Sequence, residues 1–110
     1  YSVSHANPGS GVTYDLARQI MVAKGTSILS VVAGQSTVDT AVSRAHKFHG
    51  QGYNIVFFDN KFTNIRSANC SQLVWAAYKH AGIDLDANGG LGVYPIDIYN
   101  SNLTFVWKTI

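Results

Sequence analysis

The sequence predicts an α+β domain, and three observations support this. Two segments, 36–48 and 69–81, repeat apolar residues at the three- and four-residue spacing of a helix. The segments 1–6, 27–33 and 103–110 are rich in β-branched and aromatic residues, which is typical of strands. Glycine, proline and asparagine separate these segments. Since 110 residues with 46% hydrophobic content suffice for one core, we expect a single domain over residues 1–110.

Four elements are expected in the first half of the chain. YSVSHA alternates as a strand does and ends at the turn sequence NPGSG. Apolar spacing over 13–23 predicts a helical turn or two. The segment 27–33 predicts a buried strand, and 36–48 predicts a helix with one apolar face that Gly50 and Gly52 end.

The second half is expected to be organised around one helix. Residues 53–58 are apolar and aromatic, and DNKFTN after them is typical of a loop. The helix runs from Asn69 to about Ala81. A Gly-rich loop, the segment VYPIDIYNS and a last strand over 103–110 follow it.

Composition excludes several classes of function. Only 13% of the residues are charged, the net charge is +2, and no run of Lys or Arg predicts nucleic-acid binding. No apolar stretch approaches the ~18 residues that span a bilayer. The sequence pI of about 8.8 is compatible with an anionic partner such as a cell wall.

No metal or cofactor is expected. The histidines and the cysteine lack ligand spacing, and the alternating Asp84, Asp86 and Asn88 lack the glutamate that a calcium loop requires. The chain begins with Tyr1, which suggests a processed segment, and it shows no signal-peptide pattern. One cysteine cannot form an internal disulfide, which leaves the redox compartment open.

Asn69 and the sole cysteine, Cys70, open the second predicted helix. Asn69 is a favoured N-cap residue, and Gln72 stands at the third helical position, where it completes a variant of the capping box. Cys70 is then the first helical residue, at the positive end of the helix dipole, which favours a thiolate. Asn69, or the backbone N–H groups of Cys70 and Ser71, could line an oxyanion site.

Two interpretations of Cys70 stay open on the residues alone. Free cysteine is commonly a buried packing residue, but a cysteine at a helix N-terminus is also typical of a nucleophile. The helical spacing predicts that Cys70 lies at the rim of a stripe that packs on the core, while three polar side chains point to solvent. The stripe holds Cys70, Leu73, Val74, Ala77 and Ala81, and the three polar side chains are Gln72, Lys79 and His80.

A nucleophilic cysteine needs a base, usually a histidine. His46, His49 and His80 are expected to be surface residues. His5 ends a predicted strand just before a Pro-Gly turn, a setting typical of a site, although a lone strand histidine is also commonly structural. His5 is therefore the candidate base within this chain.

Two stretches, NCSQLVWAAYKHAGIDLD and VYPIDIYNS, carry a family resemblance. They resemble the permuted NlpC/P60-like cysteine hydrolases of the YiiX and YycO type, a circularly permuted branch of the papain-like fold. In that family a Cys-Ser-x-Leu-Val-Trp-x-Ala-Tyr segment opens the helix that carries the nucleophile, and a Pro-x-Asp-Ile-Tyr element follows a Gly-rich loop. GQGYN at 50–54 resembles the family's GxxYN segment. The other matching residues are Cys70, Ser71, Leu73, Val74, Trp75, Ala77, Tyr78, Pro95, Asp97, Ile98 and Tyr99.

The resemblance implies a fold and a chemistry. The fold is a permuted papain-like domain, in which the nucleophile helix packs on a small antiparallel sheet whose first strands could be absent from this chain. Cys70 would attack an amide or ester carbonyl and form an acyl-enzyme that water releases. Tyr53 and Asn54 would border the substrate groove together with Asn69 and Ser71.

One family feature is missing from the chain. Family members place the base in an upstream His-x-Gly-Ile strand, whereas YSVSHANPGSGV resembles the later strand and turn, so His5 matches the third catalytic member. Three alternatives follow. The base lies upstream of Tyr1 in a larger protein of which this is the C-terminal part, or His5 is the base, or the chain has lost catalysis and kept the groove for binding.

The leading hypothesis is a bacterial, secreted or extracytoplasmic cysteine hydrolase, an amidase or peptidase, with peptidoglycan peptides as the first substrate. Related permuted families add a lipid acyltransferase and a secreted toxin domain as alternatives. The alternative from another class is a catalytically incomplete binding module, or one part of a two-chain assembly. Its exposed sheet edge would pair with a partner chain or with a second copy.

Overall fold

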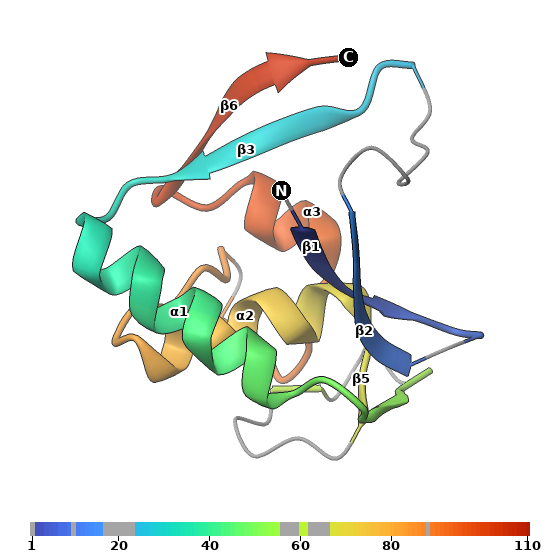
Figure 1. Cartoon of the computed structure of the whole chain (residues 1–110). Coiled ribbons are helices and arrows are strands. Elements are labelled where there is room, and N and C mark those ends of the chain that lie inside the picture. The colour runs from blue at the N-terminus through green and yellow to red at the C-terminus, as the bar shows by residue number, and fades with distance from the viewer. Residues whose placement is uncertain (1, 10, 17–23, 56–59, 62–66, 88) are drawn as a thin grey trace.

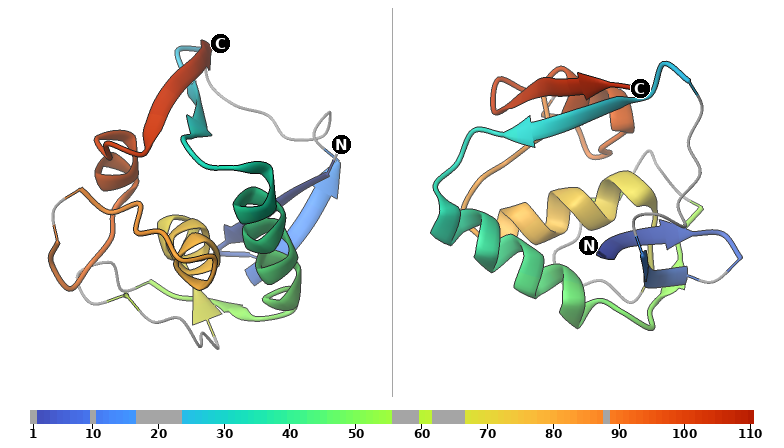
Figure 2. Two further views of the ribbon diagram at one scale, coloured as in Figure 1. Left: turned by 90° about the vertical axis from the view of Figure 1, so that its left-hand side faces the viewer. Right: turned by 45° about the horizontal axis from the view of Figure 1, so that its top comes forward.

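Two helices lie side by side, and the second of them provides much of the core. In the computed structural model, α1 (Gln35–Lys47) packs against α2 (Cys70–His80), as Figures 1 and 2 show from three directions. The structure describes all residues except 1, 10, 17–23, 56–59, 62–66 and 88. Within these described residues, no helix is long and apolar enough to cross a membrane.

The strands of the described residues pair two by two. β1 (Ser2–Asn7) pairs antiparallel with β2 (Gly11–Leu16), and β3 (Ser27–Val31) pairs antiparallel with β6 (Thr104–Thr109). A parallel pair of two residues each, β4 (Gly52–Tyr53) and β5 (Ser67–Ala68), leads into α2. The β3–β6 ribbon therefore brings an early and a late segment together above the two helices (Figure 1).

The β1–β2 hairpin faces the helices through one of its two sides. Ala6 and Val12 are register partners, and both are buried in the core. Gly11 has φ +72°, and a Cβ atom there would lie 2.2 Å from the carbonyl oxygen of Gln51. The backbone N–H of Val12 donates to that same oxygen at 2.7 Å, so only glycine allows the hairpin this close to the chain after α1.

A short helix, α3 (Pro95–Tyr99), connects the Gly-rich loop to β6. Pro95 occupies its first turn, where the missing N–H costs nothing, and the Asp97 carboxylate accepts from the backbone N–H of Tyr94 at 2.9 Å. Asp97 and Ile98 are buried. The core cluster joins α2, the hairpin, the end of α1 and the loop before α3: Ala6, Val12, Phe48, Ala68, Leu73, Trp75, Ala76, Leu85, Val93 and Ile98.

The predicted α+β class is confirmed, as are both long helices and the three strands at 1–6, 27–33 and 103–110 within a few residues. The expected helical turn over 13–23 is wrong for residues 13–16, which form β2 because they pair with β1, and residues 17–23 lie outside the described part. The apolar segment 53–58 and the DNKFTN loop are described only in part. α2 contacts an antiparallel pair through β1, but it packs mainly on α1.

Candidate active site

Cys70 is the first residue of α2, and its side chain is exposed. The predicted capping box is confirmed: the Asn69 side chain accepts from the backbone N–H of Gln72 at 3.0 Å, and the Gln72 side chain accepts from that of Asn69 at 3.4 Å. In the described part of the chain, the backbone N–H groups of Cys70 and Ser71 have no acceptor. These donors and the helix dipole favour negative charge beside the thiol.

The predicted orientation of α2 is wrong for two side chains. Gln72, expected in solvent, is only 1% exposed, because its side-chain oxygen also accepts from the Asn54 amide at 3.0 Å. Val74, expected on the core, is 38% exposed, and Cys70, expected at the rim of that stripe, is exposed as well. The core side of the helix is formed instead by Leu73, Trp75, Ala76 and Ala77.

Cys70, Val74 and Tyr78 lie on one stripe of α2 because they are four residues apart, and all three line one cavity. The cavity has a volume of about 380 Å³. Ser71 of α2 also lines it, and its other walls come from β3, β6, α3 and the segment after α2: Leu29, Val31, Leu85, Pro95, Ile98 and Thr104. Among these described lining residues none is acidic or basic, so the thiol opens onto an apolar groove.

Tyr78 contributes the one aromatic side chain among the described residues of this lining. Burial raises the pKa of the Tyr78 hydroxyl above its ordinary value. The group therefore stays protonated at neutral pH and can donate a hydrogen bond at the far end of the stripe from Cys70.

A buried amide, Asn60, connects the Gly-rich loop to the start of α2. Its side-chain N–H₂ donates to the Asn69 side chain at 3.1 Å and to the carbonyl of Val93 at 3.0 Å, and its oxygen accepts from the backbone N–H of Val93 at 2.6 Å. The Ser71 hydroxyl also donates to the Val93 carbonyl, at 2.8 Å. Asn60 and Asn69 are fully buried, so the neutral amides hold the N-terminus of α2 in place.

The sequence alone does not identify Asn60 as a residue of the site. It falls in DNKFTN, which the sequence predicts to be a loop, and its partners lie 9 and 33 residues away. A polar residue in a turn-like sequence carries no local pattern that distinguishes a buried amide from a solvated one.

The candidate base His5 does not line the cavity at Cys70. Side chains alternate along a strand, and the neighbours of His5 on β1 face the helices: Ala6 joins the core and Ser4 lines a second cavity between α1 and α2. His5 therefore points to the other side of the hairpin. The described residues that line the cavity at Cys70 include no histidine.

The remaining histidines lie at other places on the helices. His49 is half-buried, and its Nε2 lies 2.8 Å from the Ser4 hydroxyl. His46 lines the second cavity, and His80 lines a hollow beside the C-terminal half of α1. None of the three joins Cys70 in its cavity.

The other predicted groove residues support the helix more than they line the cavity. Tyr53 pairs with Ala68 in the parallel β4–β5 ladder, and the Asn54 backbone N–H donates to the Ala68 carbonyl at 3.1 Å. Neither lines the cavity at Cys70, and the Asn69 side chain is engaged in its cap. Ser71 does line the cavity, although its hydroxyl is already bonded to Val93.

The two aspartates after α2 are engaged by the protein itself. The Asp84 carboxylate accepts from the Trp75 indole and from the backbone N–H of Asp86, both at 2.9 Å. The Asp86 carboxylate forms an ion pair with Lys61. The described residues contain no cluster of three or more His, Cys, Asp or Glu side chains that could hold a metal ion.

Comparison with curated proteins finds similarity to a protein of Bacillus subtilis (strain 168) that is described as "Uncharacterized protein YycO". The two are 45% identical over 86 residues, which cover 74% of this chain and 34% of the relative. The chain thus spans about a third of the length of that relative. No family model and no solved structure matches the chain.

Proposed function

We propose that this chain carries the nucleophile of a permuted NlpC/P60-like cysteine hydrolase of the YycO type. The observation that carries the proposal is the position of Cys70: exposed, first in α2, fixed by a buried cap and open to a cavity. The similarity to the Bacillus subtilis protein supports a common ancestry with a YycO protein, although its description names no activity.

In the proposed reaction the Cys70 thiolate attacks the carbonyl carbon of an amide or ester. The N–H groups of Cys70 and Ser71 donate to the oxygen that becomes negative. The C–N or C–O bond then breaks, and the leaving amine or alcohol takes a proton from the acid form of the base. Water subsequently cleaves the thioester to release the acid and restore the thiol.

We propose that none of the four histidines of this chain is the base. His5 projects from the opposite side of its hairpin, and His46, His49 and His80 do not line the cavity at Cys70. The chain therefore provides the nucleophile and its supports, and a base from outside these 110 residues completes the site.

The uncharged lining favours an apolar acyl group in the substrate. Side chains such as Leu29, Val31 and Leu85 would bury an alkyl chain or an apolar amino-acid side chain next to the thiol. This favours an acyl ester or a lipid-like acyl donor over a charged peptide. Peptidoglycan peptides, and with them an extracytoplasmic location, stay an alternative proposal with the same nucleophile.

The test uses p-nitrophenyl acetate and p-nitrophenyl octanoate, whose leaving group needs no acid catalyst. Mass spectrometry should find one acyl group on Cys70, formed faster than on N-acetylcysteine at the same pH, and the octanoyl adduct should form faster than the acetyl adduct. Because the proposal places the base outside this chain, the adduct should persist. Cys70→Ala is the negative control, and alanine at each histidine in turn should leave acylation unchanged.

Two outcomes contradict the proposal separately. If the adduct on Cys70 forms no faster than the adduct on N-acetylcysteine, Cys70 is not an activated nucleophile. A loss of acylation of about a hundredfold in His5→Ala would instead make His5 the base.

A second function, an interaction module, is favoured by the exposed strand β6. β6 pairs with β3 on one side only among the described residues, and Phe105, Val106 and Trp107 on it are exposed. An apolar edge of this kind accepts a further strand from a partner chain or a second copy. Sedimentation of the chain should show self-association, and Val106→Lys should abolish it. The interaction-module proposal is contradicted if the chain is a monomer at all concentrations and no partner strand binds to β6.

A further inference from the structure

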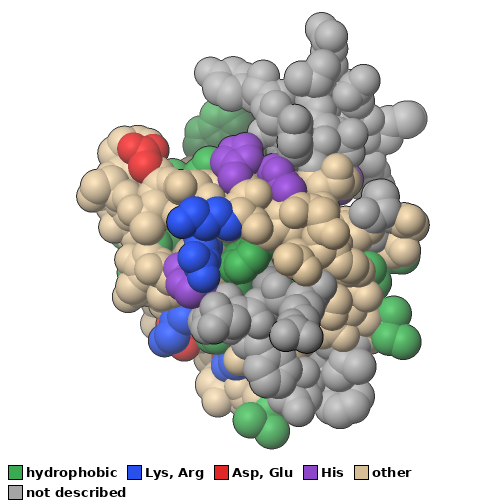
Figure 3. Space-filling model, turned by 60° about the horizontal axis from the view of Figure 1, so that its bottom comes forward, with side chains coloured by type: hydrophobic (Ala, Val, Ile, Leu, Met, Phe, Trp, Pro, Cys, Tyr) green, Lys and Arg blue, Asp and Glu red, His purple; other side chains and the backbone are tan. Residues whose placement is uncertain are grey.

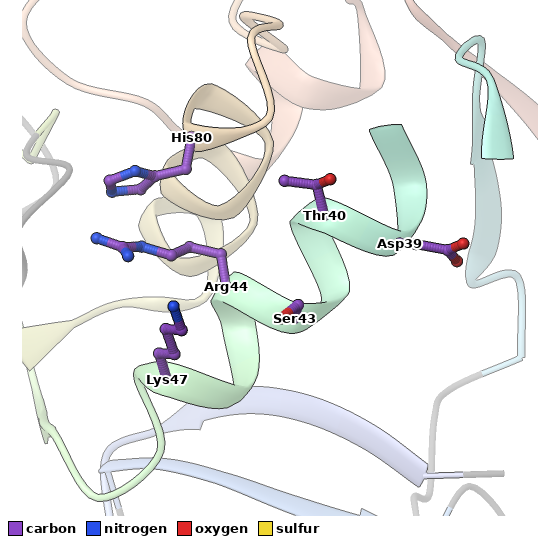
Figure 4. A pocket seen from close by; sticks show the side chains of 6 residues that line it. All are labelled: Asp39, Thr40, Ser43, Arg44, Lys47 and His80. Atoms are coloured by element: carbon purple, nitrogen blue, oxygen red, sulfur yellow. The ribbon is translucent and has the colours of Figure 1, made fainter. Parts of the chain in front are cut away.

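A basic hollow lies beside the C-terminal half of α1, on the opposite end of α2 from Cys70. Its volume is about 400 Å³. Arg44 and Lys47 line it from α1, and His80 lines it from the last residue of α2 (Figure 4). Figure 3 shows Lys, Arg and His side chains gathered on one face of the molecule.

Two of the basic side chains, Arg44 and His80, lie near the same aromatic ring. The Arg44 guanidinium carbon lies 5.5 Å from the centroid of the Phe48 ring, and the centroid of the His80 ring lies 6.2 Å from the same centroid. Phe48 itself is buried. The Arg44 and His80 side chains therefore both lie against the same ring.

Among the described residues, no acidic side chain neutralises Arg44 or Lys47. Neither forms an ion pair within that part of the chain, and the Arg44 Nε is buried with no hydrogen-bond partner there. The acid of the hollow, Asp39, points away from the basic groups and accepts from the Gln35 side chain at 2.8 Å (Figure 4).

Helix dipoles explain these residues only in part. Basic residues in the last turn stabilise a helix, and Arg44, Lys47 and His80 are all placed there. That effect acts on each helix separately and does not require the side chains of two helices to share one hollow. Arg44 and Lys47 face the same hollow as His80, while Asp39 is turned away, and this arrangement predicts a ligand that supplies negative charge to Arg44 and Lys47.

We propose that this basic hollow binds a phosphate group carried by a larger molecule. A guanidinium matches phosphate geometry with two parallel hydrogen bonds, and an ammonium adds a second charge. The Thr40 and Ser43 side chains add hydroxyl groups to the wall. The hollow is larger than a phosphate ion, so the rest of the ligand occupies the remaining volume. The phosphate belongs either to a soluble ester or to a lipid headgroup.

The test titrates the isotope-labelled chain with inorganic phosphate and with glycerol 3-phosphate at constant ionic strength. Backbone resonances of residues 43–48 and 80 should shift and saturate. Lys47→Gln and Arg44→Gln should each weaken binding about tenfold. Lys108→Gln, which removes an equal charge from exposed β6, is the matched control and should change nothing.

Vesicles of phosphatidylglycerol, compared with vesicles of phosphatidylcholine, distinguish a lipid headgroup from a soluble phosphate ester. Retention on the anionic vesicles that Lys47→Gln abolishes indicates a lipid headgroup, and binding of the soluble phosphates alone indicates a soluble ester. Shifts that never saturate, or equal losses in Lys108→Gln and Lys47→Gln, overturn the proposal. Lys47 is exposed, so its variant stays informative if Arg44→Gln fails to fold.

Discussion

The two ends of α2 are fixed by different kinds of interaction. At the N-terminus, neutral amides and a hydroxyl form a buried network around Asn69. At the C-terminus, charged groups near the surface hold the helix, since Asp84 binds the Trp75 indole and lies 3.8 Å from the Lys79 ammonium. Buried neutral networks respond little to salt and pH, whereas exposed charges respond to both.

The difference fits the chemistry proposed for each end. The network at the N-terminus fixes Cys70 without bringing a charged side chain into the cavity, so the helix dipole and the N–H groups of Cys70 and Ser71 supply the positive potential. The basic hollow at the other end holds Arg44 and Lys47, which form no ion pair with any described residue. Positive potential at the N-terminus of α2 therefore comes from backbone N–H groups, whereas the positive charge near its C-terminus comes from side chains.

The largest effect is expected from Asn60→Ala at the N-terminal end. The change leaves the buried backbone N–H of Val93 without its acceptor, and it removes one donor each from the Asn69 side chain and the Val93 carbonyl. We expect the free energy of unfolding to fall by about 3 kcal/mol. Urea unfolding at pH 7 measures this, and acylation of Cys70 should slow in the folded protein because the helix start is no longer fixed.

Asn102→Ala is the matched control, because Asn102 is exposed in the turn before β6. It should change the free energy of unfolding by less than about 0.5 kcal/mol. If Asn60→Ala behaves like this control, the network does not fix the helix, and the contrast between the two ends disappears.

The start of α2 can be predicted from the sequence because capping is local. Asn69 and Gln72 are three residues apart, and their side chains bond to each other's backbone. The predicted outward position of Gln72 is wrong because its burial depends on Asn54, 18 residues earlier. Partners so far apart along the chain leave no periodic pattern.

The cavity at Cys70 escapes sequence-based prediction for a related reason. The stripe that includes Val74 is apolar, which predicts a place in the core, but the structure places it on a groove whose other wall is formed by β3 and α3. Periodicity identifies an apolar face, and only the tertiary arrangement decides whether that face meets packed side chains or a cavity. The lack of a His-x-Gly-Ile strand leaves three alternatives open at the sequence level, namely a base upstream of Tyr1, His5 as the base, or a loss of catalysis, and which of them holds stays a prediction.

A smaller effect is expected from Asp84→Asn at the C-terminal end. Burial acts to raise the pKa of Asp84, but the hydrogen bonds from Asp86 and Trp75, and the charges of Lys79 and Lys61, together hold that pKa below its ordinary value. The ionised group therefore stabilises the fold above the unfolded pKa of about 3.9, and this stabilisation is lost as the pH falls through the lower folded value.

Because Asp84 is half exposed, we expect the variant to lose only about 0.5–1 kcal/mol at pH 7. Urea unfolding at pH 7 and pH 3 should show the difference from the wild type shrinking at pH 3. Asp39→Asn removes an exposed carboxylate from α1 and serves as the control. A difference that is equal at both pH values would mean that the Asp84 charge contributes nothing to the C-terminal end.

The smallest effect is expected from His49→Gln, between α1 and the hairpin. Burial lowers the pKa of His49, and the positive charge of His46, whose ring lies 4.9 Å away, lowers it further. The unfolded chain then binds more protons than the folded one below the unfolded pKa of about 6.5, so stability is complete above that pH and declines as the pH falls.

The wild type should lose about 0.5 kcal/mol from this source between pH 7.5 and pH 5. His49→Gln keeps a side chain that can bond to Ser4 and should remove this loss, and His46→Gln should reduce it. If both variants keep the full pH dependence, protonation of His49 is not what weakens the contact between α1 and β1, and another titrating group must be responsible.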